Sequence, residues 1–225
     1  MMNQAGTAHM VQYAVPHKLF DALIKDGRLI KAKKGQVVVG HDDSARDVYV
    51  VEEGIAQVSL YSDDGKETIF REIGPREMFG ELAALDGAPR SASVTATSDM
   101  RLHKITAAQF EHWLTTNSEA GLWFARFLIA RIREMTERSF ELATMTVVQR
   151  IHLEILRLAE HGAVEGQQVT IDHFPTQSEF AARIGTHREA ISRELSWLRS
   201  EGLIESKSRT LVVLDIDRMR QLAGQ

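Results

Sequence analysis

The stretch at residues 79–92 combines groups that together could hold a small anion; it reads Phe-Gly-Glu-Leu-Ala-Ala-Leu-Asp-Gly-Ala-Pro-Arg-Ser-Ala. Gly80 has no Cβ, so its backbone allows a ligand to approach closely. The apolar run at residues 82–85 favours a short helix, and the amides that open a helix attract negative charge. The amides expected to face the anion are those of Glu81, Leu82 and Ala83.

Three side chains of this stretch narrow the choice of anion. Arg90 offers a planar pair of donors that matches two phosphate oxygens, and Ser91 adds a hydroxyl beside it. Glu81 would repel a phosphate unless its carboxylate accepts a hydrogen bond from a neighbouring sugar hydroxyl. A phosphate next to a sugar indicates a nucleotide. The alternative is a surface loop in which Glu81 and Arg90 pair only with each other.

The whole pattern resembles a known motif, the phosphate-binding cassette of cyclic-nucleotide-binding domains. The resemblance is carried by Phe79-Gly80-Glu81-Leu82-Ala83-Ala84-Leu85 and by Pro89-Arg90-Ser91-Ala92. It implies that Glu81 binds the ribose 2′-hydroxyl and that Arg90 binds the cyclic phosphate. The residues that complete the implied cradle are Gly80, Leu82, Ala83 and Ser91.

Composition sets the class of protein. A chain of 225 residues is long enough for two domains with separate cores. Its net charge of −4 predicts no general attraction to polyanions, so any nucleic-acid surface must be local. The sequence contains no cysteine, which excludes disulfides, iron–sulfur clusters and cysteine catalysis. Because no apolar run approaches the ~20 residues of a membrane span, and no signal pattern is present, we expect a cytoplasmic protein without a membrane partner.

The elements that must position the cassette come from residues 1–116. Residues 1–15 have little periodicity and are expected to form a flexible lead-in, and residues 17–24 favour a short amphipathic helix. Residues 29–105 consist of short β-branched runs between glycines and acidic turns, including an Asp-Gly hairpin signal at residues 62–65. This texture predicts a sandwich or rolled barrel over residues 16–116, interrupted by the cassette.

A long helix is expected over residues 117–145. Thr106 begins a shorter helix, and Asn117-Ser118 has the residue types that cap the long one. One side of the long helix alternates spacings of three and four, as in a two-stranded coiled coil, so we expect a homodimer. The alternative is that the helix packs only on its own β-roll. The seam residues are Ala125, Leu128, Ile132, Met135, Ser139 and Leu142.

Residues 146–225 have the features of a small DNA-binding domain. A capping-box pattern at residues 176–179 opens one helix. Gly185 ends that helix, and a second helix follows as far as Gly202, which together predict a helix-turn-helix. Residues 203–214 are typical of a β-hairpin, or wing. The expected fold class is therefore α+β, with a jelly-roll-like β-roll, a long dimerisation helix and a C-terminal winged helix-turn-helix.

The second helix of this motif could read bases. The residues predicted to face one groove span about 140° of the helix, and the opposite side carries Ile191, Leu195 and Leu198. Arginine matches the acceptor edge of guanine, and glutamate accepts from the amino group of cytosine. The alternative is a solvated face in which Arg193 pairs with Glu189. The predicted base-reading residues are Arg188, Glu189, Ser192 and Arg193. The predicted phosphate contacts are Thr176, Ser178, His187, Lys207 and Arg209.

The run Gly-Thr-His-Arg-Glu-Ala-Ile-Ser-Arg at residues 185–193 is similar to the recognition helix of the catabolite activator / fumarate-nitrate regulator (CRP/FNR) superfamily. Its Arg-Glu-x-x-x-Arg spacing resembles the branch that reads TGTGA half-sites. The likeness covers roughly residues 17–215. It implies a homodimeric transcription regulator that binds a palindromic double-stranded DNA operator, responds to a cyclic nucleotide and works with RNA polymerase.

The same resemblance bears on the base of the nucleotide. In that family two adjacent hydroxyl residues on the long helix contact the adenine of cyclic AMP, and here the pair is Met135-Thr136. Arg131 falls where the family has an arginine close to the ligand and to the cassette glutamate. A threonine hydroxyl can donate or accept, so it suits adenine or guanine. Cyclic AMP is the first candidate from the resemblance, with cyclic GMP, or both nucleotides, as the alternative.

Other functions are less well supported by the residues. None of the nine histidines has a metal-ligand spacing such as His-Glu-x-x-His, and no nucleophile lies in a recognisable elbow, so we expect neither an enzyme nor a metal site. His103 is interpreted as a sheet residue. Two alternatives stay open, namely a cyclic-nucleotide module that regulates a partner protein and a regulator of the same fold that senses another effector.

Overall fold

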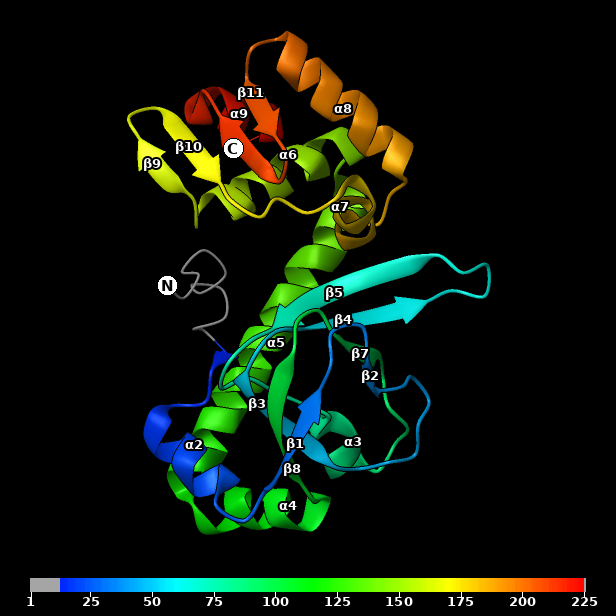
Figure 1. Cartoon of the computed structure of the whole chain (residues 1–225), viewed down its shortest axis with the longest axis vertical. Coiled ribbons are helices and arrows are strands. Elements are labelled where there is room, and N and C mark those ends of the chain that lie inside the picture. The colour runs from blue at the N-terminus through cyan, green and yellow to red at the C-terminus, as the bar shows by residue number, and fades with distance from the viewer. Residues whose placement is uncertain (1–12, 225) are drawn as a thin grey trace. The chain divides into compact units, whose positions relative to one another are not determined.

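The computed structural model of the protein describes residues 13–224. These residues form two compact units, residues 13–133 and residues 134–224, which divide within one long helix (Figure 1). No helix of this part of the chain is long and apolar enough to cross a membrane.

The first unit is a β-roll with helices. Its strands form two antiparallel sheets, with the orders β1-β8-β3-β6 and β2-β7-β4-β5. The elements are α2 (His17–Ile24), β1 (Arg28–Ala32), β2 (Val37–Val39), β3 (Val48–Glu53), β4 (Ala56–Tyr61), β5 (Glu67–Ile73), β6 (Met78–Phe79), α3 (Glu81–Asp86), β7 (Ser93–Ala96), β8 (Met100–Ile105) and α4 (Ala107–Thr116). The predicted β-roll is confirmed.

Strand β3 shows how the roll is held together, because its residues are buried on both faces. Tyr49 and Val51 point into the roll and belong to a core that draws on both sheets. Val48 and Val50 point the other way and pack with aromatic side chains of α2, α4 and the long helix. Such continuous β-branched runs suit a strand that is covered on both sides.

Local signals in the roll form as expected. The Asp-Gly hairpin joins β4 to β5, with Gly65 at φ 79° and its amide donating to the Ser62 carbonyl. The expected flexible lead-in falls mostly on residues 1–12, which lie outside the described residues. Tyr13 and Val15, however, are buried in the roll, and the Val15 amide donates to the Arg76 carbonyl at 2.8 Å. Packing therefore begins before residue 16.

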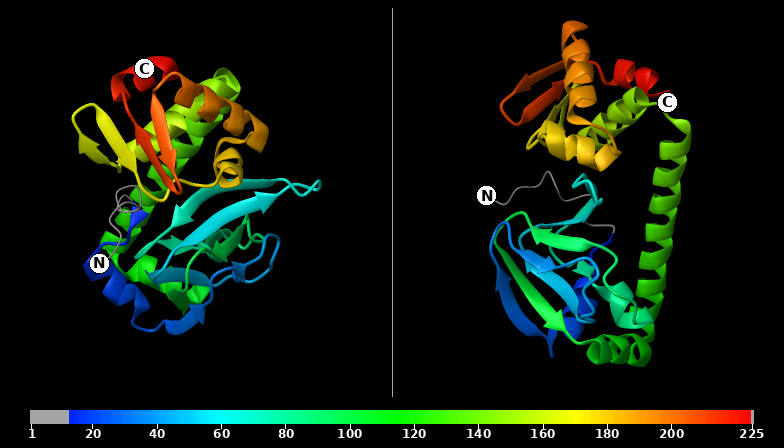
Figure 2. Two further views of the ribbon diagram at one scale, coloured as in Figure 1. Left: turned by 45° about the horizontal axis from the view of Figure 1, so that its top comes forward. Right: turned by 90° about the vertical axis from the view of Figure 1, so that its right-hand side faces the viewer.

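Helix α5 spans Ser118–Thr144 and runs through both units without a break (Figure 2). Its first amides are capped as predicted, since the Asn117 side chain accepts from the amides of Glu119 and Ala120 at 3.1 and 3.2 Å. Beyond residue 133 the helix packs on the next helix through ion pairs, where Arg157 contacts Glu141 and Arg138 contacts Glu154 at 3.2 Å. These pairs fix the end of α5 to the second unit.

The second unit is a winged helix-turn-helix around one hydrophobic core. Its small sheet has the order β11-β12-β10-β9. The predicted wing is confirmed, whereas β9 and the last helix were not predicted from the sequence. The elements are α6 (Val147–Ala159), β9 (Ala163–Glu165), β10 (Gln168–Ile171), α7 (Gln177–Ile184), α8 (Arg188–Ser200), β11 (Ile204–Lys207), β12 (Thr210–Val213) and α9 (Ile216–Ala223).

Candidate functional site

The cassette lines a cavity of about 110 Å³ in the first unit, which we call the roll cavity. Its walls come from the cassette, from the sheet β2-β7-β4-β5 and from α5. Every predicted ligand-binding residue except Thr136 lies on these walls. The lining residues are Val39, Val58, Arg71, Ile73, Phe79, Gly80, Glu81, Leu82, Ala83, Arg90, Ser91, Ala92, Val94 and Arg131.

Arg90 is held rigidly at the cavity wall. Only 3% of it is exposed, and its guanidinium donates to the carbonyl oxygens of Gly80 at 2.9 Å and Asp47 at 2.7 Å. Its backbone amide donates to the Asp43 carbonyl at 2.9 Å. The buried Nε finds no hydrogen-bond partner within the described part of the chain. A buried cation with an unsatisfied donor beside a cavity is suited to an anion.

Gly80 makes this arrangement possible. It has φ 87°, a left-handed conformation that disfavours residues with a Cβ. A Cβ at this position would lie 2.5 Å from an Arg90 Nη1 and 2.7 Å from the Asp47 carbonyl oxygen. Substitution of Gly80 would therefore push the arginine out of its place as well as strain the backbone.

The predicted short helix forms directly after Gly80. Its first backbone hydrogen bond runs from the Ala84 amide to the Gly80 carbonyl at 3.3 Å, so the three earlier amides precede the hydrogen-bonded turn. Ala83 is buried, whereas Leu82 and Ser91 are exposed at the cavity edge. The backbone of the cassette thus presents amides on the same cavity as the Arg90 guanidinium.

Glu81 lies among three arginines. Burial raises the pKa of its carboxyl, and the charges of Arg71, Arg131 and Arg90 oppose this rise. A carboxylate that has lost water gains from any hydrogen-bond donor that a ligand brings. The geometry is therefore consistent with a hydroxyl of the ligand donating to Glu81.

Arg71 is a lining residue that the sequence analysis missed. It lies on β5 between Ile69 and Ile73, which are both buried. Arg71 and Ile73 pair with Val58 and Ala56, two residues apart on β4, so they share a face of the sheet, and an arginine in step with a buried isoleucine was the available signal.

The two predicted ligand-binding residues of helix α5, Arg131 and Thr136, differ in position. Arg131 lines the cavity, and its guanidinium lies 5.2 Å from the centre of the Tyr13 ring. Thr136 is exposed and is not among the lining residues. Arg131 is therefore a wall residue of the roll cavity, whereas the role of Thr136, which lies in the second unit, stays a prediction.

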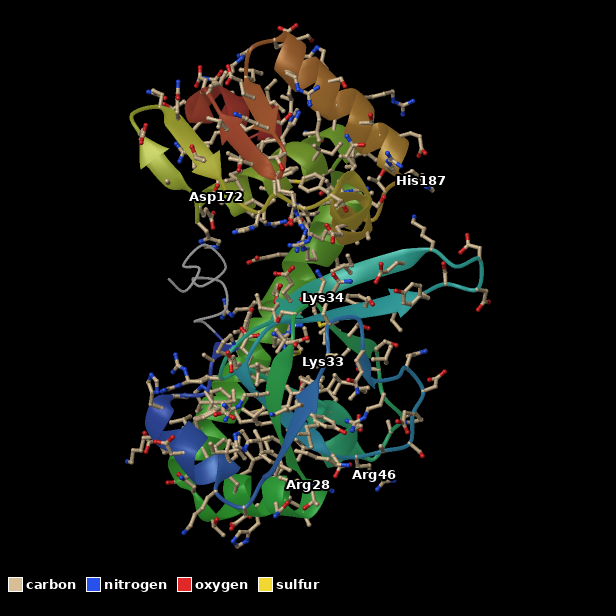
Figure 3. All side chains as sticks on the ribbon, viewed as in Figure 1. Arg28, Lys33, Lys34, Arg46, Asp172 and His187 are labelled. Carbon is tan, nitrogen blue, oxygen red and sulfur yellow. The ribbon has the colours of Figure 1, made fainter. Side chains whose placement is uncertain are left out.

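The second candidate surface is helix α8. Its N-cap is His187, which lies at the N-terminal end of the helix, as Figure 3 shows. Arg188, Glu189 and Arg193 are exposed, and Ser192 is half-buried. On the opposite side the three predicted anchors are at most 5% exposed, namely Ile191, Leu195 and Leu198. One face is thus fixed to the core, and the other presents charged groups near the start of the helix.

The turn before α8 follows its sequence signals. Thr176 forms a full capping box with Glu179, whose carboxylate accepts from the Thr176 amide at 2.7 Å. Gly185 has φ 68° and ends α7 in a left-handed conformation. This geometry places α8 directly after α7, as a helix-turn-helix requires.

The predicted phosphate contacts are all exposed on the second unit. Thr176 and Ser178 lie at the start of α7, and Lys207 ends β11 of the wing. Arg209 is in the turn of the wing, where its Nη2 lies 3.7 Å from Glu179 and its Nε donates to the Phe174 carbonyl at 3.4 Å. Arg209 is therefore tied to the start of α7 in this structure.

Helix α5 carries an exposed apolar stripe. Its members are 53% to 66% exposed, and they are Leu122, Ile129, Ile132, Met135, Phe140 and Leu142. Three of them belong to the predicted seam. Ala125 and Ser139 are exposed between them, whereas Leu128 is half-buried against the core of the roll. The seam remains a prediction, and the stripe adds Leu122, Ile129 and Phe140 to it.

Histidine and acidic side chains form no group that could hold a metal ion within residues 13–224. His103 lies in β8, and its Nε2 is 3.1 Å from the Glu52 carboxylate. This contact agrees with the interpretation of His103 as a sheet residue.

Two parts of the chain match known protein families. Residues 29–117, which contain the cassette, match the cyclic nucleotide-binding domain. Residues 149–222, which contain α7, α8 and the wing, match the Crp-like helix-turn-helix domain. Both matches agree with the geometry of the two candidate surfaces.

Similar proteins share this arrangement over nearly their whole length. The CRP-like cAMP-activated global transcriptional regulator of Mycobacterium tuberculosis is 26% identical over 203 residues, which cover 90% of this chain and 91% of the relative. A CRP/FNR-family transcriptional regulator from Thermus thermophilus superposes with a TM-score of 0.69 at 25% identity, covering 88% of this chain and 99% of that one. The c-di-GMP-responsive global regulator CLP of Xanthomonas campestris has a TM-score of 0.76 at 19% identity over 88% of this chain and 99% of its own, which shows a shared fold.

Proposed function

Because the chain belongs to the CRP/FNR family of DNA-binding transcription regulators and has a cyclic-nucleotide-binding domain, we propose that a purine cyclic nucleotide in the roll cavity controls its binding to DNA. The observation that carries the proposal is Arg90. Its buried Nε lacks a hydrogen-bond partner among residues 13–224, and its guanidinium is fixed at the cavity by two backbone carbonyls. A phosphate would satisfy this donor and compensate the buried charge.

The first candidate for the ligand is cyclic AMP, since the relative from Mycobacterium tuberculosis is described as cAMP-activated. Cyclic GMP is the alternative, because both nucleotides carry the same phosphate and ribose. In this proposal Arg90, Ser91 and the amides after Gly80 bind the phosphate, and Glu81 accepts from the ribose 2′-hydroxyl. A third candidate is a cyclic dinucleotide, because the regulator from Xanthomonas campestris responds to c-di-GMP.

The second part of the proposal is a homodimer formed through α5. A monomer would leave the six large side chains of the apolar stripe in water. Pairing two copies of α5 would bury them and would also supply two copies of α8. Two recognition helices about 34 Å apart fit successive major grooves of a palindromic site. In this proposal Arg188, Glu189 and Arg193 read the bases of TGTGA-like half-sites, and Ser192 lies beside them.

The proposed control is linkage between the two sites. A ligand shifts an equilibrium only if it binds one arrangement of the dimer better than the other. Arg131 belongs to α5 and lines the roll cavity, so the ligand would contact the helix that forms the dimer. We place the regulator in the cytoplasm, acting with RNA polymerase.

The test is calorimetric titration of nucleotide-free protein with cyclic AMP, cyclic GMP and c-di-GMP, followed by gel retardation of a palindromic TGTGA duplex with and without each ligand. We expect a cyclic mononucleotide to bind and to increase retardation of the palindrome more than that of a scrambled duplex. Failure of all three ligands to bind would contradict the proposal for the cavity. Binding without any change in retardation would contradict the linkage.

A further inference from the structure

Arg71 occupies a defined place on the wall of the roll cavity. In the sheet β2-β7-β4-β5, Val58 pairs with Val94 on one side and with Arg71 on the other. Side chains of residues paired across antiparallel strands point to the same face. Val94, Val58 and Arg71 therefore form one row across the sheet, and all three line the cavity.

This row sets the distance between Arg71 and the part of the cavity where Arg90 and Ser91 would bind the phosphate. The cassette residues Arg90 and Ser91 lead directly into β7, whereas Arg71 lies two strands away on β5. Neighbouring strands are about 4.8 Å apart, so the backbone at Arg71 is roughly 10 Å from that of β7. The two valines between them form an apolar floor. A nucleotide whose phosphate is bound by Arg90 would extend along this floor and bring its base to Arg71.

The guanidinium of Arg71 is fixed in position. Its Nη1 donates to the carboxylate of Glu77 at 2.8 Å, and the two side chains are 8% and 1% exposed. Its Nη2 donates to the Met78 carbonyl at 3.3 Å. A cation held in this way cannot swing out into water when a ligand enters, so any base that fills the cavity must be compatible with it.

The chemistry of the two purines differs at the edge that would meet this cation. Guanine presents two neighbouring acceptors, N7 and O6, whereas adenine presents the N7 acceptor and an amino donor. Arginine has only donors, so it complements guanine and opposes the adenine amino group. We infer that Arg71 is a specificity-determining residue that contacts the base, and that the roll cavity binds cyclic GMP at least as tightly as cyclic AMP.

This inference rests on the proposed function and chooses between its first two ligands. The experiment is side-by-side calorimetry of cyclic GMP and cyclic AMP with the wild type and with Arg71→Gln. Glutamine can pair with the N7 and amino group of adenine. We expect the ratio of cyclic GMP to cyclic AMP affinity to fall by about tenfold or more in the variant. The matched control is Arg101→Gln, since Arg101 lies on β8 in an exposed pair with Glu52, away from the cavity.

A second variant controls for destabilisation of the fold by the loss of Arg71. Arg71→Gln leaves Glu77 buried without its cation, so the double variant Arg71→Gln with Glu77→Gln is measured beside it, together with Glu77→Gln alone. The double variant should show the same fall in the ratio, and Glu77→Gln alone should keep Arg71 and most of the wild-type ratio.

Three results are decisive. A wild type that binds cyclic AMP more tightly than cyclic GMP would overturn the inference and leave the proposed function standing. A ratio of cyclic GMP to cyclic AMP affinity that changes less than about threefold when Arg71 is replaced would also overturn the inference. Failure of the wild type to bind either nucleotide would instead overturn the proposed function and this inference together.

Discussion

The roll cavity and helix α8 use arginine in opposite ways. Arg90 is 3% exposed, and its guanidinium is held by two backbone carbonyls. Arg188 and Arg193 are exposed on α8, and only the other face of that helix is packed. Arg90 is thus fixed by its own fold, whereas Arg188 and Arg193 are fixed only through the backbone of their helix.

This difference has an energetic consequence. A buried charge depends on a few partners, so removal of one partner has a large effect. An exposed charge on a DNA-binding surface is one of many contacts, and each contributes a smaller and partly independent amount. Ligand recognition should therefore be concentrated in single residues of the roll, and DNA recognition should be distributed over the second unit.

The largest effect is expected for Arg90→Leu. Loss of the buried guanidinium should lower cyclic-nucleotide affinity by about a thousandfold, because it removes the paired donors and the charge that the phosphate would contact. Calorimetric titration measures this, and Arg101→Leu is the matched control because Arg101 is 45% exposed. If Arg90→Leu lowers the melting temperature, Arg90→Lys should still bind weakly, since lysine keeps the charge but loses the planar fork. Affinity within threefold of wild type would remove Arg90 from the site.

Glu77 is a buried carboxyl of the roll, and its titration should make the stability of the protein depend on pH. Burial raises the pKa of Glu77 from 4.5 to about 7, although Arg71 opposes the rise. The folded chain then holds this proton more tightly than the unfolded chain, so the free energy of unfolding falls as pH rises from about 4.5 to about 7. Glu77→Gln should remove this fall, which is on the order of 3 kcal/mol at most.

Urea unfolding at pH 5 and pH 8 measures the effect. The exposed Glu189 is the control, because Glu189→Gln should leave the pH dependence of unfolding unchanged. An identical pH dependence in Glu77→Gln and wild type would mean that the buried carboxyl does not titrate in this range.

Operator binding by α8 should require a dimer of the protein, whereas nucleotide binding by the roll cavity should not. Ile132→Glu places a charge in the apolar stripe and should shift the protein from dimer to monomer, as seen by sedimentation velocity. Operator affinity should fall by about a hundredfold, because one α8 reads only half of a palindrome. Nucleotide affinity should stay within about threefold, since every lining residue belongs to residues 39–131 of one chain.

The control for the stripe is the charge reversal Lys25→Glu, at an exposed position directly after α2 and outside α5. It should stay dimeric. A nucleotide affinity that falls together with the dimer would show that the partner copy completes the cavity.

The smallest effects are expected on the DNA-binding unit. Glu189→Ala should relax specificity at one base pair by about tenfold, whereas Lys207→Ala should weaken all sequences by about threefold and reduce the salt slope by about one. Gel retardation on a set of single-base operator variants at several salt concentrations measures both. An equal loss on every sequence for Glu189→Ala would count against base reading by this residue.

Much of the fold could be predicted because its signals are local. The capping boxes at Thr106 and Thr176, the cap at Asn117 and the left-handed turn at Gly185 each depend on residues within one turn of each other. The same holds for the backbone of the cassette. Hydrogen bonds between near neighbours are set by residue type and spacing, so such elements form wherever the sequence carries them.

The apolar stripe of α5 was only half predicted. The period of the helix identified Ile132, Met135 and Leu142, but periodicity could not tell which apolar side chains the roll would cover. Leu128 packs on the roll, and Leu122 and Ile129 do not. Which apolar face of a helix is buried depends on what lies beside it.

Residue types and spacing were enough to identify the cassette, the helix-turn-helix and the wing, because in each the interacting residues are close along the chain. Only folding brought Arg71 to the cavity and the Asp47 carbonyl to Arg90, 43 residues away. These contacts depend on strand register and on the path of a loop, which are decided by the packing of the whole roll. The contact that holds Arg90 in place, and the position of Arg71 on the cavity wall, are therefore visible only in the tertiary structure.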